Sequence, residues 1–324
     1  MKRPAEWAFP ADLQPDPARQ AFDLDAAIAA VVGVRTEVPE DAFTASVLGT
    51  ERTGSGVVIR DDGLVLTIGY LVTEARSVWL STHDGRVLPG HVLGYDQTTG
   101  FGVIQPLGRL NLPPLPTGSI ATVAAGDPVV VIGHGGRQHA LQSKVLARRE
   151  FAGYWEYVLD EALFTAPAHP QWGGTAMLDS AGRLIAIGSL LIEEKVGRKR
   201  VQGNMGVPVD LLAPVLDDIL TAGRSRAVPR PWLGIYVGEA ADGLVVGGVA
   251  KGGPADVAGL REGDHLLDVA GAPASTLAEL FRRVWSLGPA GTEIEVQIRR
   301  NDARLHAVLR SADRNDFLKK PSLH

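Results

Sequence analysis

Residues 53–67 read TGSGVVIRDDGLVLT, and this stretch decides the expected fold. Apolar residues fill positions 57–59 and 64–66, and the turn sequence Asp61-Asp62-Gly63 stands between them. Aspartate and glycine favour the tight turn of a β-hairpin, whereas valine and isoleucine favour the half-buried surface of a strand. The stretch therefore predicts two antiparallel strands joined by a short turn.

The same pattern continues on both sides of this hairpin. Further strands are predicted at residues 78–81, 87–92, 129–132, 157–159 and 184–191. Helical spacing is clear only at residues 210–222, where Gly223 stops the helix. We therefore predict a mainly β domain over residues 23–223, preceded by an extended arm over residues 1–22.

A second unit follows the basic, proline-containing linker RSRAVPRP at residues 224–231. Its sequence predicts strands at 232–237, 243–246, 265–269, 293–299 and 305–309, and helices at 254–260 and 277–287. We predict an α+β domain over residues 232–313, with a polar tail over residues 314–324.

Composition bounds the class of protein. A length of 324 residues favours about two domains, and 45% hydrophobic residues supply packed cores. The formal net charge of −5 argues against a general nucleic-acid binder, and the lack of cysteine excludes disulfides and a cysteine nucleophile. No run approaches 18 apolar residues, so we expect no membrane span. No apolar stretch follows the basic residues Lys2 and Arg3, so a cytoplasmic location is the expectation.

Several stretches together resemble the HtrA family, in which a chymotrypsin-like double β-barrel protease is followed by a PDZ domain. In the first domain they are TGSGVVIRDDGLVLT at 53–67, VLGYDQTT at 92–99, GRLIAIG at 182–188 and GVPVD at 206–210. In the second they are WLGI at 232–235, GGPA at 252–255, AGL at 258–260 and GD at 263–264. The resemblance covers roughly residues 26–313. It implies a mainly β fold, a chymotrypsin-like double β-barrel followed by an α+β PDZ domain.

The resemblance also indicates where catalytic side chains would stand, and this sequence departs from the pattern there. The base position in TIGYLV is Tyr70, the acid position in TGFGV is Gly100, and the nucleophile position in HPQWGGTA is Gly173. Serine-protease chemistry needs a hydroxyl, an imidazole and an orienting carboxylate. A phenol with a pKa near 10 is a poor base at neutral pH, and glycine supplies neither other group. We predict no catalytic residues.

Two pairs of residues with possible catalytic or metal-binding chemistry also have a purely structural interpretation. Thr175 and His169 flank the nucleophile position, but strand-like spacing does not aim both side chains at one carbonyl. His134 and His139 lie five residues apart, and we favour surface histidines over a metal site. We therefore expect no metal and no cofactor.

Aromatic and charged residues outside these motifs leave alternatives open. Trp172 beside the nucleophile position either plugs the former cleft or offers a stacking surface. The run EEKVGRKR at 193–200 is interpreted as a solvated hairpin tip. Trp7 and Phe9 either pack on their own domain or, as the resemblance implies, contribute to a homotrimer.

The chemistry that remains is peptide binding. PDZ domains bind an extended peptide along a sheet edge and hold its terminal carboxylate with backbone N–H groups. By resemblance, the amides of Leu233, Gly234 and Ile235 would bind the carboxylate. The side chains of Val237, Phe281 and Val284 would join that of Ile235 in an apolar groove, and Arg230 would add favourable charge. The alternative is a packing module that binds no peptide.

The sequence supports the hypothesis of a catalytically inactive HtrA-like protein that binds C-terminal or unfolded segments as a scaffold, adaptor or regulator in protein quality control. The alternatives are an active HtrA-type serine endopeptidase and a holdase chaperone.

Overall fold

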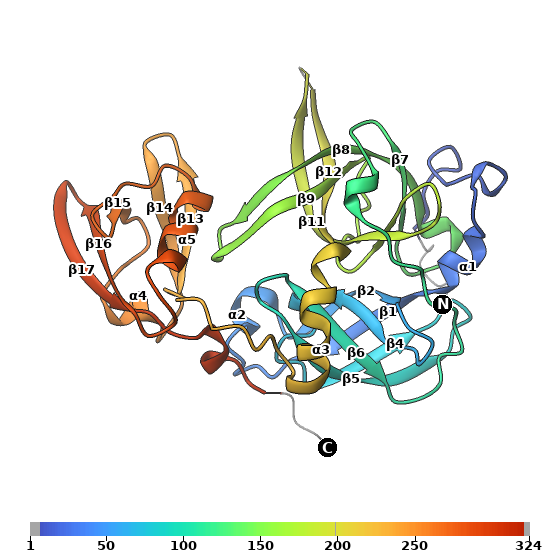
Figure 1. The fold of residues 1–324 in the computed structure, drawn as a ribbon, viewed down its shortest axis with the longest axis horizontal. Coiled ribbons are helices and arrows are strands. Elements are labelled where there is room, and N and C mark those ends of the chain that lie inside the picture. Colours follow the sequence, from blue (N-terminus) through green and yellow to red (C-terminus); the bar gives the residue numbers. More distant parts are fainter. Residues whose placement is uncertain (1–6, 198, 321–324) are drawn as a thin grey trace, which may run out of the picture. The chain divides into compact units, whose positions relative to one another are not determined.

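The computed structural model describes residues 7–197 and 199–320, which divide into two compact units. The first unit contains the chain up to Arg149, Glu161–Ser225 and the segment from Lys319, and the second contains Glu150–Asp160 and Arg226–Leu318. Residues 1–6 of the predicted arm and 321–324 of the predicted tail lie outside the described residues. Figure 1 labels the elements.

The first unit contains two closed six-stranded barrels. The first barrel is ordered β1-β2-β3-β6-β5-β4 and the second β10-β11-β12-β9-β8-β7. The strands of the first are β1 (Val31–Glu37), β2 (Glu51–Val58), β3 (Val65–Ile68), β4 (Ser77–Ser81), β5 (Val87–Tyr95) and β6 (Phe101–Pro106). Those of the second are β7 (Pro128–Ile132), β8 (Ala140–Gly153), β9 (Tyr157–Ala166), β10 (Ala176–Leu178), β11 (Leu184–Val196) and β12 (Lys199–Pro208).

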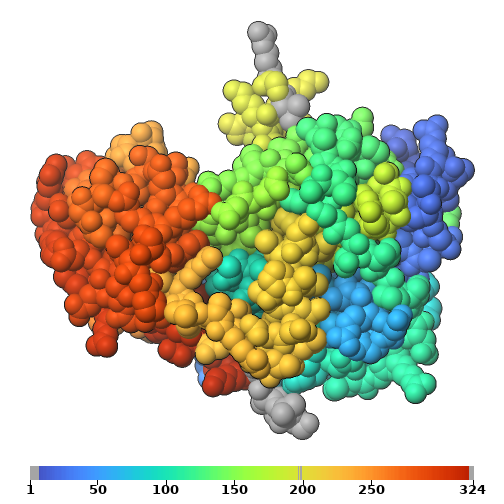
Figure 2. Space-filling model, in the orientation of Figure 1, coloured from blue at the N-terminus to red at the C-terminus, as the bar shows by residue number. Residues whose placement is uncertain are grey.

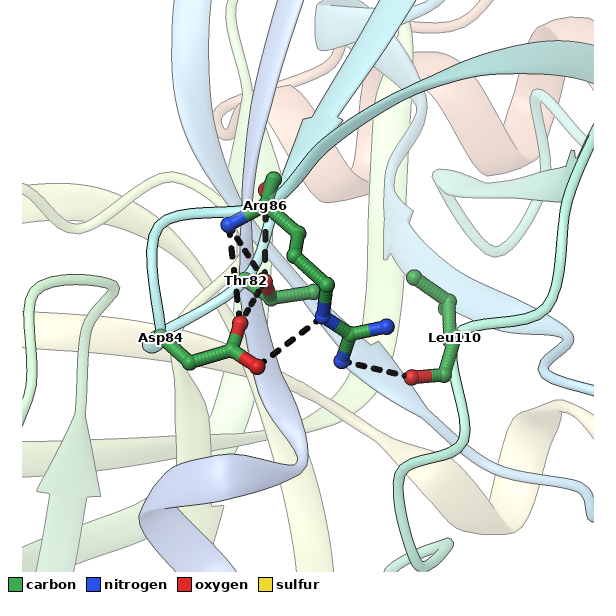
Figure 3. Close-up of polar contacts among 4 residues, drawn as sticks. All are labelled: Thr82, Asp84, Arg86 and Leu110. Atoms are coloured by element: carbon green, nitrogen blue, oxygen red, sulfur yellow. Dashed lines mark hydrogen bonds and ion pairs between the residues drawn. The ribbon is translucent and has the colours of Figure 1, made fainter.

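The predicted hairpin is the β2–β3 pair, in which Val57 stands opposite Leu66. Both side chains are fully buried in the barrel, which satisfies their apolar character. The next hairpin, β4–β5, turns through Asp84, as Figure 3 shows. Asp84 accepts hydrogen bonds from the Thr82 hydroxyl and from Arg86 Nε at 2.9 Å, and Arg86 Nη2 donates to the Leu110 carbonyl at 2.8 Å.

Short helices precede, connect and follow the barrel strands. They are α1 (Leu24–Ala29), α2 (Ala45–Leu48), α3 (Ala213–Ala222) and the 3-10 turns η1 (Pro17–Arg19), η2 (Gly69–Leu71), η3 (Ile120–Thr122), η4 (Arg137–His139) and η5 (Val209–Leu211). Gly223 ends α3 as predicted, with a left-handed φ of 74°. Among the described residues, no helix is long and apolar enough to cross a lipid bilayer.

The described residues of the charged run, 193–197 and 199–200, lie at the far end of the β11–β12 hairpin, which projects from the second barrel in Figure 1 and Figure 2. Glu193 pairs with Gln202 across the ladder, and its carboxylate accepts from Arg200 at 2.7 Å. Both side chains are exposed, so this ion pair contributes little to stability.

The second unit is built on a five-stranded antiparallel sheet ordered β13-β14-β15-β16-β17. Its elements are β13 (Ile235–Ala240), β14 (Gly243–Val249), α4 (Pro254–Val257), β15 (His265–Val269), α5 (Leu277–Ser286), β16 (Glu293–Arg300), β17 (Ala303–Arg310) and η6 (Arg314–Phe317). Leu277, Leu280, Phe281 and Val284 form the buried stripe of α5 at helical spacing. The predicted fold class, a double β-barrel followed by an α+β domain, is confirmed.

Candidate functional site

The first candidate site is the cleft around the three positions that resemble a catalytic triad. Tyr70 lies in η2, directly after β3, and its hydroxyl donates to the Ser189 carbonyl at 2.8 Å. Burial raises the pKa of Tyr70 well above its usual value, against a smaller lowering by a hydrogen bond with Trp172. The phenol therefore stays protonated and is a hydrogen-bond donor, so it does not accept a proton at neutral pH.

Gly173 lies against this phenol. A Cβ atom at position 173 would stand 2.7 Å from the Tyr70 hydroxyl oxygen, closer than non-bonded contacts allow. The Gly173 carbonyl also accepts from the Ser55 amide at 2.8 Å, which fixes the loop against β2. The position of the Tyr70 ring therefore requires a residue without a side chain at position 173.

Gly100, at the position expected for the acid, lies in the turn between β5 and β6. Its φ of 81° is left-handed, a conformation that glycine adopts without strain. Its carbonyl accepts from the Gly69 amide at 2.6 Å, next to Tyr70. The fold thus brings the three positions into one neighbourhood, and the groups there are a phenol and two glycines.

The amide geometry in the 169–173 loop differs from an oxyanion hole. In the serine-protease template, the N–H groups of the nucleophile and of the residue two positions earlier bind the oxyanion. Here the earlier N–H, that of Gln171, donates to His169 Nδ1 at 3.1 Å. One of the two oxyanion donors is therefore already used within the protein.

His169 and Thr175 do not form a nucleophile–base pair. His169 is fully buried, and besides the Gln171 amide its ring contacts the His139 carbonyl through Nε2 at 3.0 Å. Burial lowers the pKa of His169 to about 4, so the ring is neutral and donates through Nε2. The Thr175 hydroxyl donates to the Trp172 carbonyl at 3.1 Å. These contacts give both side chains structural roles.

The N-terminal aromatic residues pack on the same region of the first unit. The Trp7 ring lies 4.3 Å from that of His139 and 5.6 Å from that of His169, centroid to centroid. Phe9 contacts the His169 ring and packs against the second barrel's core. Both aromatic residues therefore pack on their own domain. Among the described residues, no three His, Cys, Asp or Glu side chains gather as a metal site would need.

A cavity of about 470 Å³ remains open at the cleft. It is lined by Gly33, Val34, Arg35, Thr53, Gly54, Tyr70, Ser81, His134, Pro170, Gln171, Trp172 and Gly173. Trp172 is half-buried in this lining, so it narrows the cleft without filling it.

The second candidate site is the loop at residues 233–235, which holds a carboxylate of the same chain. The Leu233 and Gly234 amides donate to Glu156 at 2.9 and 2.7 Å, and the Ile235 amide donates at 3.1 Å. Gly234 has a φ of 74°, which turns neighbouring amides toward one anion. The three amides that the sequence singled out thus converge on a single carboxylate.

Glu156 belongs to the tip of the β8–β9 hairpin, which packs within the second unit. We use "the tip segment" for residues 154–158, whose sequence is YWEYV. The Tyr154 carbonyl accepts from the Val237 amide at 3.0 Å, and Val158 is buried in the same cluster as Val237, Phe281 and Val284. The tip segment is therefore hydrogen-bonded to β13 and shares a buried cluster with the groove side chains. The Arg230 guanidinium lies 4.3 Å from the centroid of the Trp285 ring.

Sequence reasoning missed Glu156. The available signal was one acidic residue among Phe151, Tyr154, Trp155 and Tyr157, a composition unusual for a solvated hairpin tip. Nothing in that composition identifies the amides, which lie 77 to 79 residues further along the chain.

Comparisons with known proteins agree with this architecture. Residues 54–187 match the trypsin-like peptidase domain, and residues 231–310 match the PDZ domain. The chain is 27% identical over 286 residues to a putative serine protease, HhoA, of Synechocystis, covering 80% of this chain and 70% of that protein. It is 26% identical over 271 residues to the serine endoprotease DegS of Escherichia coli K12, covering 78% and 74%.

One further relative is matched over a smaller share of its length, and a solved structure shows similarity of fold alone. A probable periplasmic serine endoprotease of Halomonas elongata, described as DegP-like, is 25% identical; the match covers 82% of this chain but only 57% of that relative. The solved HtrA-type protease AlgW with a tripeptide gives a TM-score of 0.54 at 24% identity, covering 95% of this chain and 99% of AlgW.

Proposed function

We propose that this chain, which belongs to the HtrA-like proteins with a trypsin-like peptidase domain followed by a PDZ domain, binds polypeptide segments without cleaving them. Its role would be that of a scaffold, adaptor or regulator in protein quality control. The observation that carries the proposal is the contact between Tyr70 and Gly173, because it occupies the space that a nucleophilic side chain needs.

Three further features support an inactive cleft. The phenol of Tyr70 is held protonated by burial, the Gln171 amide is used by His169, and Gly100 provides no carboxylate. Removing a whole triad lowers kcat by roughly 10⁶-fold in the subtilisin-type protease where it has been measured.

The binding half of the proposal rests on the second unit. A loop whose three amides surround a carboxylate is built to accept that group, and PDZ domains use such loops for peptide C-termini. An apolar final side chain suits the cluster of Val237, Phe281 and Val284. A client of this site would thus carry a free C-terminus with an apolar last residue.

Casein hydrolysis by the full chain tests the inactive cleft. We expect no turnover above a boiled sample and no labelling by a serine-directed fluorophosphonate. Turnover that the fluorophosphonate abolishes would instead support the active endopeptidase that the relatives' names suggest.

Peptide capture tests the binding half. Gly234→Glu places a bulky acid in the carboxylate-binding loop, where φ is 74° and a Cβ atom would stand 3.1 Å from the Trp232 ring, so capture of C-terminal peptides should be lost. Gly271→Glu is the matched control, because Gly271 also has a left-handed φ, of 75°, but has open space around it. Equal capture by both variants would contradict the proposed site.

The homotrimer implied by the family resemblance stays part of this proposal. Mass photometry of the full chain should give a single species near three times 34.3 kDa. A monomer peak alone would remove the trimer from the proposal without affecting peptide binding.

A further inference from the structure

The carboxylate-binding loop of the second unit is already filled by a group chemically equivalent to a peptide C-terminus. Glu156 is 6% exposed, and its two carboxylate oxygens accept from three successive backbone amides. Hydrogen bonds from successive backbone amides to the oxygens of a carboxyl group are the interactions that such loops use for their ligands. The side chain of Glu156 therefore satisfies the loop completely.

The backbone of the tip segment also uses the sheet edge. β13 is the edge strand of the sheet, and its Val237 amide donates to the Tyr154 carbonyl at 3.0 Å. An edge strand exposes unpaired amides and carbonyls, and a bound peptide pairs with them. The tip segment thus takes at least one of the main-chain hydrogen bonds that an added peptide strand would make.

The same segment also contributes to the buried apolar cluster of the second unit. Val158 is 8% exposed and belongs to the buried cluster that contains Ile235, Phe281 and Val284. Arg282 of α5 forms ion pairs with Glu150 and Asp160, one on each strand of the hairpin. The arginine is about half exposed, so these ion pairs orient the hairpin and add little stability.

We propose that the tip segment is an internal competitor of peptide ligands, with Glu156 standing in for their C-terminal carboxylate. This inference rests on the proposed function and refines it. A polypeptide with a free carboxylate and an apolar last residue binds only after the tip segment has left the loop and the sheet edge. Its apparent affinity is reduced by the fraction of molecules in which the groove is open.

The backbone of Glu156 supports this competitor role. Its φ of 61° is left-handed, which few residues other than glycine and asparagine adopt. The strain is compensated in the docked state by the amide contacts, and a released tip is free to relax it. Docking is consequently a reversible alternative to peptide binding.

The test compares the full chain with its Glu156→Ala variant in binding a fluorescent decapeptide that ends in a free valine. We expect the variant to bind about tenfold or more tightly, since removing the internal carboxylate opens the loop. The same peptide with an amidated C-terminus should bind neither protein. Glu161→Ala, an exposed acid on the same hairpin, is the matched control and should behave like the unchanged chain.

Hydrogen exchange of the 233–235 amides measures directly whether the tip segment covers the loop. In the unchanged chain the 233–235 amides should exchange slowly, and in Glu156→Ala they should exchange at least tenfold faster until peptide is added. Slow exchange without peptide in the variant would show that the tip segment does not protect the loop and would overturn the inference.

The outcomes separate the inference from the proposed function. Equal and measurable peptide affinity in both proteins would overturn internal competition and leave peptide binding standing. Absence of binding in both proteins, with fast exchange in the variant, would overturn the proposed function and with it the competition that depends on it.

Discussion

At position 173 the lack of a side chain is explained by a neighbour. The Tyr70 hydroxyl lies where the side chain would begin, and its hydrogen bond to the Ser189 carbonyl holds the phenol in place. A hydroxymethyl group introduced there has to displace the half-buried phenol from this hydrogen bond. This one pairwise contact therefore leaves no room for a side chain at position 173.

Gly173→Ser alone should neither create a nucleophile nor be tolerated well. We expect a loss of about 1–3 kcal/mol in the free energy of unfolding, because the new side chain overpacks the contact with Tyr70. Urea denaturation measures the loss, and Gly238→Ser is the control because nothing lies within 4 Å of a Cβ there. Equal stability of the two variants would contradict the proposed contact.

Glu156 should make loop protection depend on pH. Burial raises the pKa of Glu156 from 4.5 to about 7, against lowering by the Leu233, Ile235 and Gly234 amides and by the charge of Arg314. A raised pKa means that the docked state binds the proton more tightly. Its stabilisation is complete below about pH 4.5 and is lost as the pH rises through about 7.

Hydrogen exchange at residues 233–235, corrected for intrinsic rates, should therefore be faster at pH 8 than at pH 5. Tyr236 also faces this carboxylate, and the pKa of the Tyr236 phenol is raised, chiefly by burial, so that it stays neutral over this range. Glu156→Gln should remove the pH dependence. A corrected rate that is the same at pH 5 and pH 8 would mean that the carboxylate does not change protonation in the loop.

At the scale of elements, hairpins with polar turns were the predictable part of the fold. The β2–β3 and β4–β5 pairs are indicated by Asp-Gly turns between apolar residues, and this information is local. β8 and β12 were not predicted as strands, because their outer halves, ARREFA at 147–152 and KRVQ at 199–202, have no apolar alternation. Their strand conformation comes from pairing in long hairpins.

The β4–β5 turn in Figure 3 gives a test at this scale. Hydrogen bonds from Thr82 and Arg86 lower the pKa of Asp84 from 3.8 to about 2. The carboxylate therefore stabilises the turn above about pH 4, and this contribution is lost as the pH falls through about 2.

Asp84→Ala should consequently unfold at a higher pH than the unchanged chain during acid titration followed by circular dichroism. Asp61→Ala, in the turn of the β2–β3 hairpin, serves as the comparison. Identical acid midpoints for the two variants would show that the hydrogen bonds of Asp84 do not stabilise the turn.

At the scale of the whole molecule, the double β-barrel and the domain after it could be predicted because many short motifs occur in the expected order. The positions Tyr70, Gly100 and Gly173 followed from the same order. The Gln171–His169 hydrogen bond and the docking of Glu156 could not be predicted in this way. Each depends on side-chain or loop geometry, which produces no periodic pattern in the sequence. The candidate sites could thus be located from sequence motifs, whereas the groups that occupy them are visible only in three dimensions.

Restoring all three triad side chains tests whether the fold retains a usable protease framework. The Tyr70→His, Gly100→Asp, Gly173→Ser triple variant should react with fluorophosphonate but hydrolyse casein about 10²–10³-fold more slowly than an active relative, because one oxyanion donor is used by His169. The Tyr70→His, Gly100→Asp double variant, which retains Gly173, is the control and should not react. Full activity of the triple variant would show that the Gln171 amide is free to turn toward substrate.

The contact between Tyr70 and Gly173 has a consequence for descent. In a lineage that starts from this sequence, a serine at position 173 arrives with a loss of stability as long as the aromatic ring is present at position 70. Each intermediate is worse packed than its parent. Packing between positions 70 and 173 therefore opposes a return to a catalytic serine, whereas changes in the peptide-binding unit meet no such obstacle.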